Sequence, residues 1–195
     1  SVRGHVMQPG VVPYSVNAQL WSDGAEKLRF LALPGTEKID FTQKGAWGLP
    51  EKTVLVKSFS LHLEEGNPAS KRFIETRFLT KQEGEWIGYS YLWNDEQTDA
   101  TLVSKEGVDR EYTIQTSNGE RKQAWHYPSR AECMVCHSRA AAYVLGVNTQ
   151  QLNRIHDYHG VVDNQLRVFE HLGLFKSTNW LEAAKQTLRS ELQQQ

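Results

Sequence analysis

The chain has 195 residues, 39% hydrophobic and 23% charged, and its 22 basic and 23 acidic residues leave a formal net charge of −1. This length suffices for one domain of good size, or for a main domain with a smaller appendage. The balanced charge lacks the basic excess typical of nucleic-acid binders, and no apolar run approaches the roughly 20 residues that cross a bilayer. We therefore expect neither nucleic-acid binding nor a membrane span.

The first two thirds of the chain predict β structure. Short runs rich in Val, Ile, Thr and aromatic residues are separated by Gly, Pro and Asn turn residues, with no helical pattern between them. In one run Tyr89, Tyr91 and Trp93 share a face, as in a half-buried strand. The pattern favours an antiparallel β-sandwich or barrel-like body over residues 1–127. The expected strands are 28–33, 53–63, 72–80, 86–93 and 111–116.

After about Pro128 the pattern changes to helix formers with apolar residues three or four apart. Thr, Asp and Asn stand at helix starts and Gly at helix ends. We expect an α+β protein in which the β-rich body 1–127 and a helical, haem-binding segment 128–195 pack as one unit. The expected helices are 140–145, 149–158, 163–172 and 179–193.

The haem expectation comes from the chain's only two cysteines, Cys133 and Cys136, which are followed directly by His137. C-x-x-C-H is the attachment signal of haem c. The two thiols add to the porphyrin vinyl groups, and the adjacent histidine becomes the proximal iron ligand. We therefore expect one covalent haem c, with Cys133 and Cys136 as thioethers and His137 on the iron.

Three other interpretations of the cysteines are less favoured. A zinc site could use both thiols with His156 and His159, but that histidine spacing is tighter than usual. A thiol–disulfide centre usually opens a helix in a βαβ unit, and no such alternation occurs here. A structural disulfide would close a very short loop and stabilise little.

The sixth iron ligand has several candidates in the sequence. No methionine follows Met134, so the downstream methionine that many small cytochromes c use does not exist here. His126 precedes Cys133 by seven residues, and six extended residues span about 20 Å, enough to pass round a haem edge. We expect His126 as the distal ligand. The alternatives are His156, His159, Met7 or an open site.

Beyond the cysteine motif, the chain contains short blocks in a fixed order. They are LWSDGAEK at 20–27, TVLVKSF at 53–59, IETR at 74–77, GYSYLWN at 88–94 and WHYPSR at 125–130. Over most of its length the chain thereby resembles a family of secreted bacterial haem-c proteins. In some of them the haem domain is fused to a β-propeller like that of PQQ-dependent glucose/sorbosone dehydrogenases. The family's Trp-His-x-Pro element falls at 125–128 and supports His126.

The resemblance implies an extracytoplasmic, periplasmic or secreted domain that accepts electrons from a partner oxidoreductase, for which a PQQ-dependent sugar dehydrogenase is a candidate. Haem c is attached after export, and the chain does not start with Met, so we expect a mature or excised segment of an exported protein. Residues near the motif in sequence could surround the haem or bind its propionates, although surface charges and core aromatics have the same appearance. They are Arg130, Trp125, Tyr127, Arg139 and Arg154.

Electron transfer without catalysis is the function that we expect. One alternative is a haem enzyme or ligand sensor with an open distal site. Another is a zinc-stabilised β domain that binds a carbohydrate or a protein partner. That alternative requires the face of Tyr89, Tyr91 and Trp93 to be exposed.

Overall fold

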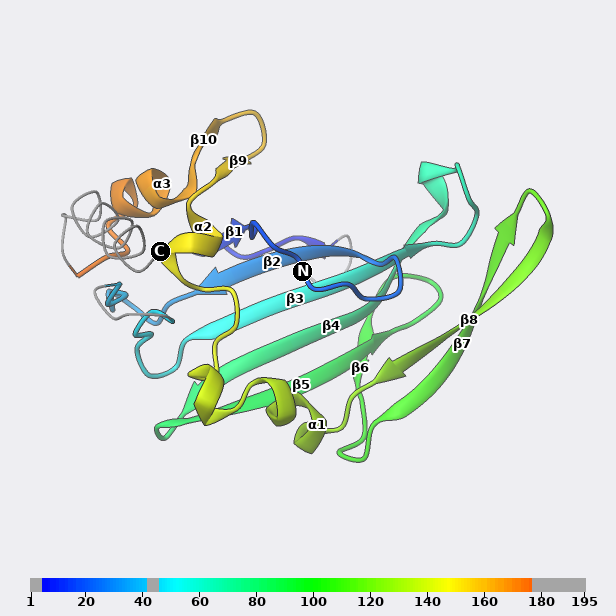
Figure 1. Cartoon of the computed structure of the whole chain (residues 1–195), viewed down its shortest axis with the longest axis horizontal. Helices are drawn as coiled ribbons and strands as arrows, with labels where there is room; N and C mark the ends of the chain where they lie inside the picture. Colours follow the sequence, from blue (N-terminus) through cyan, green and yellow to red (C-terminus); the bar gives the residue numbers. More distant parts are fainter. Residues whose placement is uncertain (1–4, 42–45, 177–195) are drawn as a thin grey trace, which may run out of the picture.

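The computed structural model describes residues 5–41 and 46–176, and its main element is one open antiparallel sheet. Six strands follow one another in chain order as a meander, so every strand pairs with its sequence neighbours (Figure 1). The strands are β1 (Val11–Tyr14), β2 (Glu26–Ala32), β3 (Val54–His62), β4 (Lys71–Gln82), β5 (Glu85–Trp93) and β6 (Ala100–Leu102).

The sheet has two different faces because successive side chains on a strand point in opposite directions. One face carries the row Leu31, Leu55 and Leu79, which are paired across β2, β3 and β4. The C-terminal segment packs on these residues, and we call this the covered face. The opposite face, which carries Val56 and Phe78, is called the open face.

A second, two-stranded sheet lies on one half of the covered face. It consists of β7 (Val108–Thr116) and β8 (Gly119–Tyr127) (Figure 1). In β8, Trp125 and Tyr127 point inward and are 3% and 0% exposed, so they form a second core cluster with Phe59 and Ile74 of the large sheet. A bulge opposite Phe59 helps to build this cluster, because the extra residue directs Ile74 toward the covered face beside Glu75.

Short elements complete the chain. They are the 3₁₀ turn η2 (Pro68–Ser70), α1 (Arg130–Cys136), the 3₁₀ turn η3 (Arg139–Ala141), α2 (Thr149–Leu152), β9 (Ile155–Asp157), β10 (Val162–Asn164) and α3 (Gln165–His171). α2 and α3 place Leu152, Leu166 and Phe169 on the leucine row of the covered face. No helix within the described ranges is long and apolar enough to cross a membrane.

The prediction of an α+β protein with a β-rich body is confirmed, and all five expected strands are present. The body is an open sheet with a partial second layer rather than a closed barrel. The helix expected over 149–158 is wrong: α2 ends at Leu152, and Ile155–Asp157 forms a hairpin with Val162–Asn164. The helix expected over 140–145 is also wrong, because Ala142 and Tyr143 have positive φ angles of 49° and 61°.

The helix expected over 163–172 is confirmed as α3, apart from its ends. The one expected over 179–193 lies outside the described residues.

Candidate functional site

The cysteine motif is presented by α1, which follows the end of β8 directly. Ser129 caps this helix: its hydroxyl accepts from the Glu132 N–H at 3.1 Å, and the Glu132 carboxylate accepts from the Ser129 N–H at 2.8 Å. Such a reciprocal capping box satisfies two amide donors that a helix start leaves free. The backbone N–H of His137 then closes the helix on the Cys133 carbonyl at 3.1 Å. The capping box at the start of α1 and the backbone hydrogen bond at its end therefore fix the relative positions of Cys133, Cys136 and His137.

α1 lies directly on β5 at a glycine. A Cβ atom built on Gly88 would lie 2.7 Å from Cβ of Cys133 and 3.0 Å from its Sγ. Separations below 3.0 Å are not tolerated, so any side chain at this position would push the helix away. Gly88 thus sets how closely the first cysteine approaches the covered face.

Both thiols are free, and they lie in different surroundings. Cys133 is half-buried against the sheet, and burial raises the pKa of its thiol. Cys136 is exposed, and so is the neighbouring Val135, at 75%. The second thiol and Val135 are therefore accessible to a group that approaches α1 from the solvent side.

His137 has the geometry of a metal-binding imidazole. Its Nδ1 lies 2.6 Å from the carbonyl oxygen of Tyr143. A carbonyl only accepts, so the proton is on Nδ1 and the lone pair is on Nε2, which has no hydrogen-bond partner among the described residues. Burial lowers the pKa of His137, and the nearby cations Lys57 and Arg77 lower it further. Metal ligands are typically held in this way, neutral and oriented through their second nitrogen.

A row of cations crosses the covered face beside the motif. Arg29, Lys57 and Arg77 are direct cross-strand partners on β2, β3 and β4, and we call them the cation row. Burial is the main cause that lowers the pKa of Lys57 to about 7, and Arg29 and Arg77 add to it. Like charges opposite each other in a sheet are destabilising, so this arrangement is unfavourable by itself.

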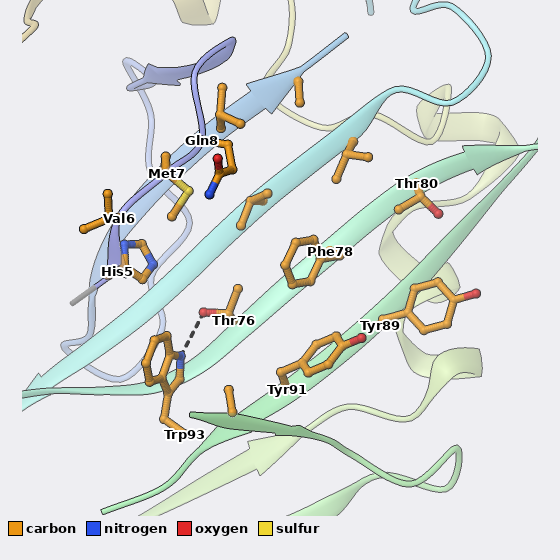
Figure 2. Close-up of a pocket in the computed structure, with 15 residues that line it drawn as sticks. His5, Val6, Met7, Gln8, Thr76, Phe78, Thr80, Tyr89, Tyr91 and Trp93 are labelled. Carbon is orange, nitrogen blue, oxygen red and sulfur yellow. Dashed lines mark hydrogen bonds between the residues drawn. The ribbon is translucent and has the colours of Figure 1, made fainter. Parts of the chain in front are cut away.

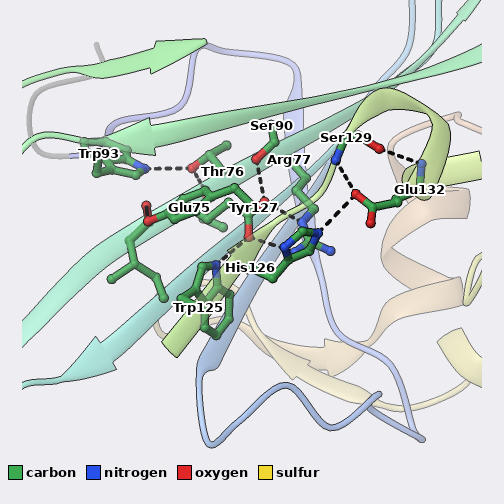
Figure 3. A network of polar contacts seen from close by, with 12 residues as sticks. Glu75, Thr76, Arg77, Ser90, Trp93, Trp125, His126, Tyr127, Ser129 and Glu132 are labelled. Carbon is green, nitrogen blue, oxygen red and sulfur yellow. Dashed lines mark hydrogen bonds and ion pairs between the residues drawn. The ribbon is translucent and has the colours of Figure 1, made fainter. Parts of the chain in front are cut away.

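Only part of this charge is balanced within the described chain. Glu75 is fully buried and binds Arg77 through two hydrogen bonds, of 2.6 and 2.8 Å (Figure 3). The same carboxylate accepts from Ser90 at 2.5 Å and from the Trp125 indole at 2.9 Å. The Glu75 carboxylate therefore already accepts four hydrogen bonds. It fixes the position of Arg77 and forms no ion pair with Lys57.

The candidate distal ligands lie in different places. His126 is exposed, and its two nitrogens contact Asp109 at 2.7 Å and Glu132 at 3.1 Å (Figure 3). These carboxylates raise the pKa of His126 and favour the imidazolium, which cannot bind iron until it releases a proton.

His156 resembles His137 more closely. Its Nδ1 lies 3.0 Å from the Ser15 hydroxyl, and its Nε2 has no described hydrogen-bond partner. It belongs to the segment whose helices pack on the covered face. His159 is exposed in the turn between β9 and β10. Met7 lines a cavity on the open face, across the sheet from Cys133.

The residues that the sequence predicts around a haem lie in several different parts of the structure. Trp125 and Tyr127 are core residues of the second cluster, and the Tyr127 hydroxyl donates to the Ile74 carbonyl at 3.0 Å. Arg130 is exposed and lies over the Tyr89 ring, 5.0 Å from its centroid. Arg139 contacts the Tyr143 hydroxyl at 3.4 Å, and Arg154 donates to the Val16 carbonyl. Sequence proximity to the motif therefore did not identify the cation row.

The zinc alternative lacks an assembled ligand set. Within residues 5–41 and 46–176, no three His, Cys, Asp or Glu side chains gather as a metal site. Cys133 and Cys136 are thus not joined by His156 and His159, and a tetrahedral zinc site would need four ligands together.

The open face contains a cavity of about 680 Å³ (Figure 2). Phe78, Tyr89, Tyr91 and Trp93 form its aromatic wall, and His5 and Met7 lie along its rim. Trp93 is only 4% exposed, and its indole N–H is already bonded to the Thr76 hydroxyl at 2.9 Å. Tyr89 and Tyr91 are half-buried, so the aromatic face is only partly exposed to a ligand.

No protein-family model, curated protein or solved structure matches the chain. The cation row was not predicted from the sequence, although one of its members left a signal there. Lys57 lies between Leu55 and Phe59 on one face of the strand, where an apolar residue is expected.

Proposed function

We propose that the chain is a mono-haem c-type cytochrome domain that transfers electrons. Cys133 and Cys136 would form the two thioethers, and His137 would bind the iron as proximal ligand. The observation that carries the proposal is the His137 ring, which is neutral, half-buried and fixed through Nδ1 to Tyr143 while Nε2 stays available. In a C-x-x-C-H motif this is the nitrogen that binds iron.

Other features of the covered face fit the same group. Both thiols are reduced, and α1 presents the second one on an exposed, apolar surface beside Val135. The cations of the row suit a ligand that combines an apolar ring with negative charges. When bound, haem would supply reversible one-electron exchange at the iron. The chain would attach it, orient His137 and shield one side of the ring with the sheet.

The compartment and the partner follow from the same proposal. Haem c is joined to reduced thiols after export, so we propose a periplasmic or secreted location. The partner would be a redox protein, and the resemblance described above makes a PQQ-dependent sugar dehydrogenase the first one to test.

Covalent haem is tested by producing the chain with a cytochrome c assembly system. The intact mass is expected to exceed that of the polypeptide by one haem, and peroxidase staining should persist after denaturing electrophoresis. Replacing Cys133 and Cys136 together by alanine should abolish both signals, because no thioether can form. An unmodified mass with stoichiometric zinc in the wild-type chain would contradict the proposal.

The distal ligand needs its own test, because two histidines are candidates. The sequence favours His126, whereas the structure favours His156, whose Nε2 has no described hydrogen-bond partner. Loss of the true ligand should leave haem attached but give a high-spin iron that binds carbon monoxide readily. His126→Ala and His156→Ala are therefore compared by visible spectroscopy, with His159→Ala as an exposed control. If both variants remain low-spin, neither assignment is correct. A wild-type protein that binds carbon monoxide without delay would instead favour the sensor or enzyme alternative.

A further inference from the structure

The cation row has more positive charge than the described part of the chain balances. Arg29 is 8% exposed, yet its described side-chain contact is a 3.5 Å hydrogen bond to Gln19, which is neutral. Lys57 lies over the Phe59 ring, 4.9 Å from its centroid, and has no carboxylate within ion-pair distance among the described residues. Only Arg77 has an anionic partner, Glu75. Among the described residues, Arg29 therefore has no acidic partner, and the nearest carboxylate that acts on Lys57 is Glu75, which is already paired with Arg77.

The groups packed against the row do not supply that charge. On the sheet, Tyr14 pairs with Arg29 across β1 and β2, and burial raises the pKa of its phenol to about 12, so it stays neutral. Lys27 adds another cation one row away. From the C-terminal segment, Arg154 also faces Arg29, and its Nε is buried without a hydrogen-bond partner.

The row also lies beside the attachment point. Ser90, the partner of Arg77 on β5, is two residues from Gly88, the residue on which Cys133 packs. Two residues along a strand correspond to about 7 Å. The row runs between the leucine row of the first cluster and the Phe59 and Glu75 row of the second. The leucine row supplies apolar surface on one side of the cations and Phe59 supplies an aromatic ring on the other, an arrangement that suits an apolar ring with acidic substituents.

Resting on the proposed function, we propose that Lys57, together with Arg29 and Arg77, binds the propionate carboxylates of the attached haem. Arg77 is held by Glu75 and offers its remaining N–H groups, whereas Lys57 and Arg29 contribute positive charge that no described carboxylate pairs with at ion-pair distance. The same chemistry could also bind a free inorganic anion, and the experiment must separate the two sources.

The first measurement is the midpoint potential of the haem-loaded protein. Lys57→Met keeps the aliphatic stem but removes the charge, so a carboxylate that is left unpaired should favour ferric iron. We expect the oxidation equilibrium to shift about tenfold, which is about 59 mV downward for one electron. The control is Lys122→Met, which removes an exposed cation on β8 that contacts Glu111 and Thr113. Equal potentials in wild type and both variants would overturn the proposal.

The second measurement needs no covalent haem and uses the full chain with Cys133→Ala and Cys136→Ala. Tryptophan fluorescence should report tighter binding of protoporphyrin IX than of its dimethyl ester, and Lys57→Met should remove that preference. Equal binding of acid and ester would overturn the proposal, because it would mean that the row does not bind the carboxylates. Complete displacement of protoporphyrin IX by millimolar phosphate would also overturn it, in favour of a site for a free anion. Absence of haem on the wild-type chain would instead refute the proposed function, so the two failures are distinguishable.

Discussion

Replacing Glu75 by leucine is expected to lower the free energy of unfolding by about 3–5 kcal/mol, because Arg77 loses its partner and the buried Ser90 hydroxyl and Trp125 indole N–H lose their acceptor. Glu75 is 0% exposed and accepts four hydrogen bonds, from Arg77, Ser90 and Trp125. The variant would also leave the whole cation row without an acidic neighbour. Because Arg29 and Lys57 are largely buried, added salt should relieve this defect only weakly.

Urea denaturation of the haem-free chain measures this loss directly. The matched control is Glu111→Leu, which removes an exposed carboxylate 3.5 Å from Lys122. Exposed pairs of this kind contribute about 0–1 kcal/mol. A loss below about 1 kcal/mol for Glu75→Leu would mean that the buried network does not stabilise the fold in the way described.

If the chain carries haem c as proposed, replacing Gly88 by valine is expected to block its attachment while leaving the sheet folded. Valine is favourable in a strand, but its Cβ would lie 2.7 Å from that of Cys133, so α1 must move. Overpacking of this kind costs about 1–3 kcal/mol, and a correctly docked helix would be about thirtyfold rarer at the middle of that range. Intact mass after maturation should show mostly polypeptide without haem.

Ile87→Ala is the control for Gly88→Val, because it changes the neighbouring residue on the other face of β5. It should leave haem attachment unchanged. Circular dichroism verifies that both variants retain the sheet. Full attachment in Gly88→Val would show that close packing of Cys133 on β5 is not needed for the site.

The propensities of single strands were visible in the sequence, but their partners were not. Each of the five expected runs became a strand, since alternating apolar and aromatic residues have a strong local signal. β8 was missed because its first half is Glu120, Arg121 and Lys122, which face water on a ribbon. The segment 149–158 was misjudged because the hairpin of Ile155–Asp157 depends on pairing with residues further along the chain.

By itself, the sequence determined the chemistry that the chain can offer: two thiols and an imidazole at a fixed spacing, with no downstream methionine. Covalent spacing is a property of the chain and needs no fold. Only the tertiary structure decided what surrounds that motif, because strand register brings together residues that are 20 or more positions apart. Arg29, Lys57 and Arg77 form one row only when β2, β3 and β4 pair in this register, and a slip by one residue would turn a strand's cation to the opposite face.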